Sequence, residues 1–391
     1  MSLYEVADGL LGTHVTWMDI EQDMQKALNT NAIFGENKKI TLIGDKIIAS
    51  QLSLITLGEN FAKDEESSVF DSDKLSSMAQ MTFDTHNREV DMYMNLKESN
   101  EDIKCLKTYT LHKFTETNQL KGYIICDYIP NIYQIPFYEL LSFDEVLPVF
   151  NSISNLVVLG QQLKMKQKAI DEGINLIEKT FYEFFDQETL DNMIISIGKQ
   201  FPDEYKTQSV QLMDTLRLYS SRTIIRKYGS ICEFLGHEKV LTHGDLWTSN
   251  MIFSKTDGHI QLESIIDWQT VSWTGPGNDI ARILLSDVHS NTRREKKQEL
   301  IETYYDNIMK KLKDQPIPFT LEQLFDSYHL YFPVLAILGC NEMSRINELD
   351  EIHPGNEKVK NYMMDHYIKV MEDVIEQHNY NLQNYPTFFE S

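Results

Sequence analysis

The segment from Val240 to Arg282 constrains the fold of this chain more than any other stretch of its sequence. It reads VLTHGDLWTSNMIFSKTDGHIQLESIIDWQTVSWTGPGNDIAR. A short apolar run predicts a strand that ends at His243, and two apolar runs on either side of an Asp-Gly pair at 257–258 predict a β-hairpin. The segment therefore predicts a polar loop that is fixed between a buried strand and a hairpin.

The rest of the chain divides into two regions with different expected secondary structure. Up to Pro130 the pattern is mixed, with helices expected over 16–28, 51–62 and 76–98 and strands over 39–43, 46–49, 105–114 and 121–128. Beyond it, helical periodicity covers 143–170, 171–198, 203–228, 279–290, 293–313, 320–346 and 356–377. We therefore expect an α+β fold with a small mixed N-lobe over 1–128 and a mainly helical C-lobe over 129–391.

Composition excludes several classes of partner. The 391 residues carry a formal charge of −23, which argues against a nucleic-acid groove and against an anionic membrane surface. The four cysteines are scattered, so neither a disulfide framework nor structural zinc is expected. No run of 18 apolar residues occurs and the first residues lack a basic start before an apolar run. We expect a reduced, cytoplasmic protein, and its oligomeric state stays open.

Three polar residues of the central segment fit phosphoryl transfer. Asn250 follows Asp245 by five residues, and Asp267 ends the second hairpin strand 17 residues further on. A carboxylate on a rigid loop can accept the proton of an attacking alcohol, while an amide oxygen and a second carboxylate can hold Mg²⁺ on nucleotide phosphates. Each residue alone is more often a helix cap or turn residue, but the three together in this context favour the chemistry.

The motif HGDLWTSN followed by IIDWQTVSWTGPGNDIAR resembles the CHK kinase-like family, which includes ecdysteroid-kinase-like proteins. Its relatives are choline/ethanolamine kinases and aminoglycoside phosphotransferases. The resemblance implies a two-lobed, protein-kinase-like fold that uses ATP and Mg²⁺ to phosphorylate a hydroxyl of a small molecule. It implies Asp245 as catalytic base, Asn250 and Asp267 as metal ligands, and Asp279 and Arg282 as supports of the loop. For His243 we favour a structural role, because Asp245 already fills the role of the base.

The resemblance also extends to the first lobe. HNREVDMY (86–93) resembles the family's helix whose Glu pairs with the nucleotide-binding Lys, which makes Glu89 the candidate. Lys46, in GDKIIASQL, is the candidate lysine, and such a pair would hold the ammonium over the nucleotide phosphates. Two surface charges are the alternative. Asp127 and Tyr128 match the hinge position at which backbone groups hold adenine.

One departure from the family pattern keeps a second function open. Only ITLIGD separates Lys39 from Lys46, which leaves no room for the strands and loop that cover the phosphates in kinase-like folds. The alternative to an active phosphotransferase is therefore a pseudokinase or a nucleotide- or small-molecule-binding module.

A protein kinase is disfavoured, because Pro276 comes only nine positions after Asp267, which leaves no room for a long activation segment. The sequence does not name the acceptor. A steroid alcohol, a choline-like amine and a xenobiotic hydroxyl all remain possible.

Overall fold

The structure is a computed structural model, and it describes residues 6–40, 72–163, 187–313, 315–341, 346 and 355–390. Lys46, the strand expected over 46–49, the helix expected over 51–62 and most of the strand expected over 39–43 lie outside these residues. The chain divides into two compact units, and each is described by itself. Unit 1 comprises Met1–Asn100, Cys105–Ile132 and Ser264–Thr270, and unit 2 comprises Glu101–Lys104, Tyr133–Glu263 and Val271–Ser391.

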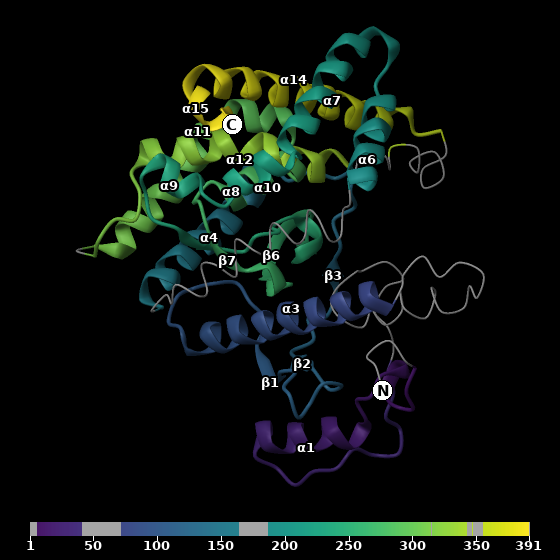
Figure 1. Cartoon of the computed structure of the whole chain (residues 1–391). Helices are drawn as coiled ribbons and strands as arrows, with labels where there is room; N and C mark the ends of the chain where they lie inside the picture. Colours follow the sequence, from purple (N-terminus) through teal and green to yellow (C-terminus); the bar gives the residue numbers. More distant parts are fainter. Residues whose placement is uncertain are drawn as a thin grey trace. The chain divides into compact units, whose positions relative to one another are not determined.

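Unit 1 combines two helices with an antiparallel hairpin (Figure 1). Its elements are α1 (Trp17–Leu28), α3 (Ser72–Glu98), β1 (Thr108–His112), β2 (Tyr123–Cys126) and the short helices η1 (Leu10–Gly12) and η5 (Trp268–Thr270). Helix α1 begins at Thr16, whose side chain accepts from the Asp19 N–H while the Asp19 carboxylate accepts from the Thr16 N–H. Both helices pack on β1, and α3 also packs on η5.

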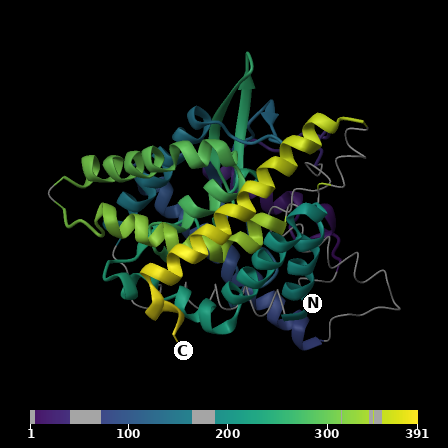
Figure 2. The ribbon, with the colours of Figure 1, turned by 90° about the horizontal axis from the view of Figure 1, so that it is seen from above.

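Unit 2 is mainly helical. Its helices are α4 (Phe143–Gln162), α6 (Gln187–Lys199), η3 (Asp203–Tyr205), α7 (Lys206–Tyr219), α8 (Arg222–Tyr228), α9 (Ile231–Leu235), η4 (Thr248–Asn250), α10 (Asn278–Ser286), α11 (Ser290–Leu312), α12 (Leu321–Asn341), α14 (Glu357–Asn384) and α15 (Pro386–Phe389). Helix α12 packs on α10 and α14, and α14 also packs on α7 and α11. In Figure 2 the long yellow helix α14 runs across the green helices beneath it.

The strands of the C-terminal half form two small sheets. β4 (Val240–Thr242) pairs antiparallel with β7 (Ser272–Thr274), and β3 (Ile132–Tyr133), β5 (Met251–Thr256) and β6 (His259–Ile265) form a three-stranded sheet in the order β3-β5-β6. Asp257 and Gly258 connect β5 to β6 with φ of 51° and 84°. A two-residue turn with both φ positive matches the right-handed twist of the strands, which confirms the predicted hairpin.

Helix α4 fixes β4 in the core of unit 2. The helix is predominantly apolar and is buried over Phe150 and most of its C-terminal half. Gly160 lets it approach the strand, because a Cβ at this position would lie 2.7 Å from Leu241 Cβ. The strand that leads into the polar loop, β4, therefore packs against α4 and pairs along its edge with β7.

The expected α+β class is confirmed, because small sheets accompany the helices of both units. The helix predicted over 203–228 is in fact broken into η3, α7 and α8. The break between α7 and α8 arises because Ser220 ends α7 and Ser221 caps α8 with its side chain, which accepts from the Ile224 N–H. The helix predicted over 356–377 continues to Asn384. Among the described residues, no helix combines the length and apolar character needed to span a bilayer.

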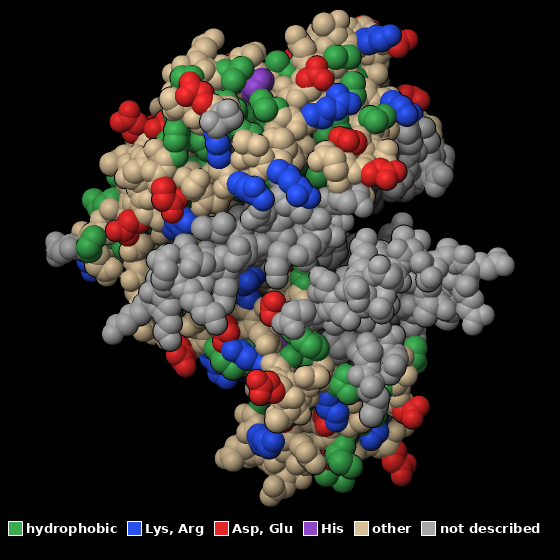
Figure 3. Space-filling view, in the orientation of Figure 1, with side chains coloured by type: hydrophobic (Ala, Val, Ile, Leu, Met, Phe, Trp, Pro, Cys, Tyr) green, Lys and Arg blue, Asp and Glu red, His purple; other side chains and the backbone are tan. Residues whose placement is uncertain are grey.

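Charged side chains of both signs lie on the surface. On the face shown in Figure 3, Lys and Arg side chains are interspersed with Asp and Glu, and the described part of this face carries no extended field of one sign. The formal charge of −23 is thus spread rather than gathered at one place on this face.

Candidate active site

The loop that follows β4 carries the predicted base, and buried hydrogen bonds fix its start. His243 is fully buried, and Gly244 has φ of 90°, a conformation that favours glycine. The N–H of His243 donates to Asp279 Oδ2 at 2.7 Å, and the N–H of Gly244 donates to Asp279 Oδ1 at 2.9 Å. One carboxylate of α10 therefore holds two consecutive backbone groups just before Asp245.

Asp279 acts as an anchor that is removed from solvent. It is 4 % exposed and lies in the first turn of α10, where the helix dipole favours a carboxylate. Burial raises the pKa of Asp279, and the charge of His243 and the two backbone N–H groups partly oppose that rise. Asp279 thus bonds to the start of the loop, and the supporting role that the resemblance implied for it stays a prediction.

Asp245 stands on this braced loop with its carboxylate open to solvent. The Asn250 side-chain amide donates to the Asp245 backbone carbonyl at 2.8 Å and to Asp245 Oδ2 at 3.2 Å. Arg282 Nε donates to Asp245 Oδ1 at 3.4 Å, and its guanidinium lies 5.3 Å from the Trp247 ring centroid. The Asp245 side chain is 39 % exposed, whereas that of Arg282 is 7 % exposed. The structure thus brings together Asp245, Asn250 and Arg282.

His243 takes a structural place in the same loop. Its Nδ1 accepts from the Asp245 N–H at 3.4 Å, a long hydrogen bond, and its ring is buried beneath the loop. This position fits the hydrogen-bonding role expected of it.

Sequence reasoning missed a second carboxylate of the loop. Asp287 Oδ1 accepts from the Thr248 N–H at 3.1 Å and from the Thr248 hydroxyl at 2.6 Å. Asp287 is 4 % exposed, and burial raises its pKa to about 6 against the opposing effects of Thr248 and Arg282. A signal was present, because Asp279, Arg282 and Asp287 fall on one side of an otherwise apolar helical segment.

Unit 1 places a different pair of carboxylates together. Glu89 lies on α3, is 7 % exposed, and accepts a hydrogen bond from the Trp268 backbone N–H. Burial, followed by the negative charge of Asp267, raises the pKa of Glu89 to about 8. Next to Glu89 on the helix, Arg88 donates to the Gln269 carbonyl at 3.2 Å, so α3 is bonded to the segment that follows Asp267.

Asp267 has an unusual backbone. Its φ is 63°, a left-handed conformation that non-glycine residues seldom adopt and that often marks a functional position. The residue follows β6 and precedes the fully buried Trp268. The segment Trp268–Thr270 (η5), which follows Asp267 directly, packs against α3.

The predicted hinge residues lie directly after β2. The Asp127 N–H donates to the Lys107 carbonyl at 2.9 Å, and the Asp127 carboxylate accepts from the Tyr109 hydroxyl. Tyr128 is 71 % exposed. Their role toward adenine stays a prediction, as does that of Lys46, which lies outside the described residues.

The residues present fit a hard divalent cation. Asn250 uses its NH₂ group toward Asp245, which directs its amide oxygen away as a ligand of the kind that Mg²⁺ accepts. In unit 1, burial first and the charge of Asp267 second raise the pKa of Glu89, so these two carboxyl groups lie within electrostatic reach of each other. Among the described residues, no group of three or more His, Cys, Asp and Glu forms an all-protein metal cage, and Mg²⁺ seldom uses one.

The fold and the loop together define the class as α+β proteins in which a polar loop, held by a buried carboxylate, follows a buried strand. More particularly, the chain belongs to the DUF1679 family, described as "Uncharacterized oxidoreductase dhs-27", which it matches over residues 3–47 and 46–382.

Two curated relatives come from Caenorhabditis elegans. "Uncharacterized oxidoreductase dhs-27" is 23 % identical over 261 residues, which cover 64 % of this chain and 30 % of the relative. "Uncharacterized kinase-like protein D1044.1" is 25 % identical over 218 residues, which cover 55 % of this chain and 54 % of the relative. The matches thus span about a third and about half of the relatives' own lengths.

Among solved structures, the chain is similar to an ethanolamine kinase from Plasmodium vivax. The identity is 17 %, the match covers 75 % of this chain and 74 % of that chain, and the TM-score is 0.36.

Proposed function

We propose that the protein is an ATP-dependent phosphotransferase that phosphorylates a hydroxyl group of a small molecule, with Asp245 as the catalytic base. The observation that carries the proposal is the loop around Asp245. Asp279 holds two consecutive N–H groups before the carboxylate, Asn250 and Arg282 bond to it, and its side chain still reaches solvent. A pre-organised carboxylate of this kind can take the proton of an alcohol without rearranging.

Asn250 and Asp267 are the proposed ligands of Mg²⁺, and ATP is the proposed donor. A bound Mg²⁺ would neutralise charge on the nucleotide phosphates. The amide oxygen of Asn250 is oriented by the hydrogen bonds that its NH₂ group makes to Asp245. Asp267 directly precedes the buried Trp268 and lies within electrostatic reach of Glu89. Glu89 and Lys46 are the proposed pair that orients the phosphates, and Asp127 and Tyr128 are the proposed adenine hinge.

The name "kinase-like" of one relative agrees with this proposal, and the name "oxidoreductase" of the other does not conflict with it. The relative named an oxidoreductase is matched over only 30 % of its length, so its name describes a longer chain. The sequence also contains no Gly-x-Gly-x-x-Gly run of the kind that binds dinucleotides.

Calorimetric titration with ATP, with and without Mg²⁺, tests nucleotide use first. Saturable binding that requires Mg²⁺ and is lost in Asp267→Ala supports the donor side. Transfer of the terminal phosphate of labelled ATP to a panel of hydroxylated steroids, choline-like amines and aminoglycosides then tests the reaction. No binding at millimolar ATP would refute the phosphotransferase. Binding without transfer to any acceptor would favour the alternative of a binding module.

A further inference from the structure

The turn between α10 and α11 joins the loop around Asp245 to helix α14. Asp287, the residue that ends α10, accepts two hydrogen bonds from Thr248 of the loop, and two positions later His289 caps the start of α11. Helices α11 and α14 pack against each other within unit 2. The groups that fasten this turn to α14 are therefore placed to affect the loop.

Two histidine side chains accept hydrogen bonds from backbone N–H groups at this turn. His289 Nδ1 accepts from the Asn291 N–H at 3.2 Å, and Nδ1 of His366 on α14 accepts from the Ser290 N–H at 3.2 Å. The centroids of the two rings lie 5.6 Å apart. A neutral imidazole that accepts at one nitrogen carries its proton on the other, so both rings have the Nε2–H form.

Protonation of either ring would remove an acceptor from the turn. Both nitrogens of an imidazolium are donors, so a charged His289 or His366 would point an N–H at the backbone N–H from which it now accepts. His289 would then no longer cap α11, and its positive charge would lie at the helix end where the dipole disfavours a cation. The hydrogen bonds of this turn therefore require neutral rings.

The surroundings of the two rings also disfavour a positive charge. His366 is 1 % exposed, and the Nε2 atom of His289 is buried without a hydrogen-bond partner among the described residues. Burial is the largest cause that lowers the pKa of both histidines, and Arg293 and Lys369 lower it further. Asp365 acts in the opposite direction on the pKa of His289, and it is itself paired with Lys369 at 2.6 Å.

The other titratable groups around the rings provide no direct counter-ion. Arg293 is 2 % exposed and is already bonded to Asp373 of α14. The rings of Tyr362 and Tyr367 contact the two histidines from α14, and Glu139 lies within electrostatic reach of Tyr362. In the part of the chain that the structure describes, no carboxylate forms an ion pair with either histidine ring. An imidazolium would therefore stay without a direct partner.

We propose that His289 and His366 form an acid-sensitive latch, which holds the start of α11 on α14 while both rings are neutral and releases it when they are protonated. Release loosens the turn that carries Asp287 and with it the hydrogen bonds to Thr248. The latch does not depend on the proposed phosphotransferase activity, and only its effect on turnover rests on that function.

The two states of the latch set the direction of the pH effect. In the open state each ring titrates with a pKa near the ordinary histidine value of 6.5, whereas the closed state keeps the ring neutral at that pH. The stability that the latch contributes is therefore full above about pH 7 and is lost as the pH falls below 6.5. Between pH 7.5 and 5.5, each histidine should shift the equilibrium toward the open state about tenfold.

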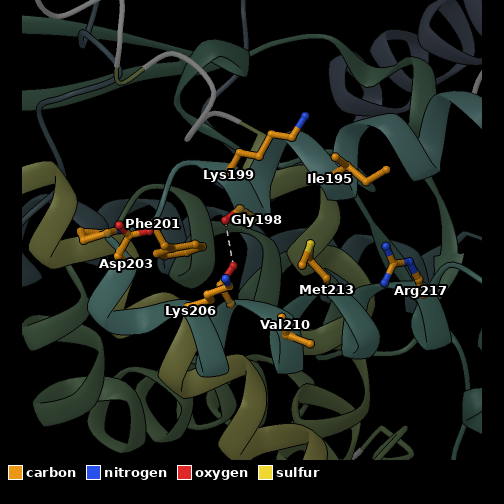
Figure 4. A pocket seen from close by; sticks show the side chains of 11 residues that line it. Ile195, Gly198, Lys199, Phe201, Asp203, Lys206, Val210, Met213 and Arg217 are labelled. Carbon is orange, nitrogen blue, oxygen red and sulfur yellow. Dashed lines mark hydrogen bonds between the residues drawn. The ribbon is translucent and has the colours of Figure 1, made fainter.

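Hydrogen exchange of the full chain at pH 7.5 and 5.5, corrected for the intrinsic effect of pH on exchange, tests the latch. We expect the segment 287–293 to lose protection by at least about tenfold at pH 5.5. The contact between α6 and α7 provides an internal control, because the Ser209 hydroxyl donates to the Gly198 carbonyl at 2.8 Å and the segment 187–219 contains no histidine (Figure 4). Its protection should change by less than about threefold, and an equal loss in both segments would overturn the proposal.

The double variant His289→Asn/His366→Asn should keep the protection of 287–293 at both pH values. The Oδ1 atom of each Asn takes the place of Nδ1 as an acceptor that does not titrate, and Asn is a favourable helix cap. His259→Asn, at the exposed start of β6, is the matched control and should behave like the parent. A double variant that loses protection at pH 5.5 as the parent does would refute the latch.

Nitrogen NMR of the histidine rings tests the parent protein directly, and it decides the matter if the double variant does not fold. At pH 7.5 we expect His289 and His366 to show the Nε2–H form, with Nδ1 as the acceptor. The single variants His289→Asn and His259→Asn assign the signals. The Nδ1–H form in either ring, or rings that are already charged at pH 7.5, would contradict the proposal.

Discussion

The carboxylates that bond to the loop around Asp245 and the carboxylates near α3 differ in what surrounds them. In unit 2, Asp279 and Asp287 each accept two hydrogen bonds from the loop that they brace. In unit 1, Glu89 accepts one backbone hydrogen bond and faces the like charge of Asp267, so that its pKa rises to about 8. The comparison teaches that hydrogen bonds from the loop satisfy the buried carboxylates of unit 2, whereas burial and a neighbouring like charge leave Glu89 of unit 1 with a strongly raised pKa.

Replacing Asp245, the proposed base, should have the largest effect on turnover. We expect Asp245→Asn to lower turnover by about 10²- to 10⁴-fold, because the variant keeps the shape of the side chain but cannot accept the proton of the acceptor. Steady-state kinetics with the acceptor found in the panel measures the loss. The thermal midpoint should fall only slightly, since the single carbonyl oxygen of Asn can still accept from either Asn250 or Arg282 and the Asp245 side chain is 39 % exposed. Turnover within threefold of the parent would remove Asp245 from the mechanism.

Removing the anchor should have the next largest effect. Asp279→Ala leaves the buried N–H groups of His243 and Gly244 without their acceptor, and each such loss costs about 1–3 kcal/mol. We expect the free energy of unfolding from urea titration to fall by about 3 kcal/mol, and turnover to fall with it. Asp306→Ala on α11 serves as a control, because Asp306 is an exposed residue outside the loop. A variant as stable as the parent would show that the loop needs no carboxylate anchor.

The pH dependence of stability tests the buried carboxyl group of Glu89 in unit 1. The folded-state pKa of Glu89 lies near 8 and the ordinary value is 4.5, so between these values the folded protein holds a proton that the unfolded chain releases. Its contribution to stability is therefore full below about pH 4.5 and declines as the pH rises to 8, by up to about 1.4 kcal/mol per pH unit. We expect Glu89→Gln, which can still accept from the Trp268 N–H, to flatten the decline of the thermal midpoint between pH 5 and 8.

The exposed carboxyl of Glu116 provides the matched control, because Glu116→Gln should leave the pH profile of the parent unchanged. Parallel profiles for Glu89→Gln and the parent would mean that Glu89 is already charged in the folded protein, and hence that a cation accompanies it.

The sequence predicted the parts of the fold whose signals are local. The Asp-Gly turn at 257–258 gave the hairpin, and helical periodicity gave α1, α4, α10 and α12. It could not show that Ser221 caps a new helix inside one continuous periodic stretch, because a serine in a helix and a serine at a cap look alike without the backbone.

For the candidate site, the motif placed Asp245, Asn250 and Asp279 on one loop system, and the structure adds their hydrogen bonds. The contact between Asp287 and Thr248 joins residues 39 positions apart and follows from tertiary packing alone. The pKa of Glu89 is likewise set by burial, which no short pattern reports.

The contact between Thr248 and Asp287 yields the smallest and most specific prediction. Thr248→Val keeps the branched shape and the backbone N–H but removes the hydroxyl that donates to Asp287 Oδ1. We expect the free energy of unfolding to fall by about 1 kcal/mol, the usual net value of one hydrogen bond, while Thr256→Val at the exposed end of β5 changes it little. Because the Thr248 hydrogen bond lowers the pKa of Asp287, its loss should also raise that pKa above about 6. A variant that keeps its stability but loses turnover would show that Asp287 positions the loop for catalysis more than it stabilises the fold.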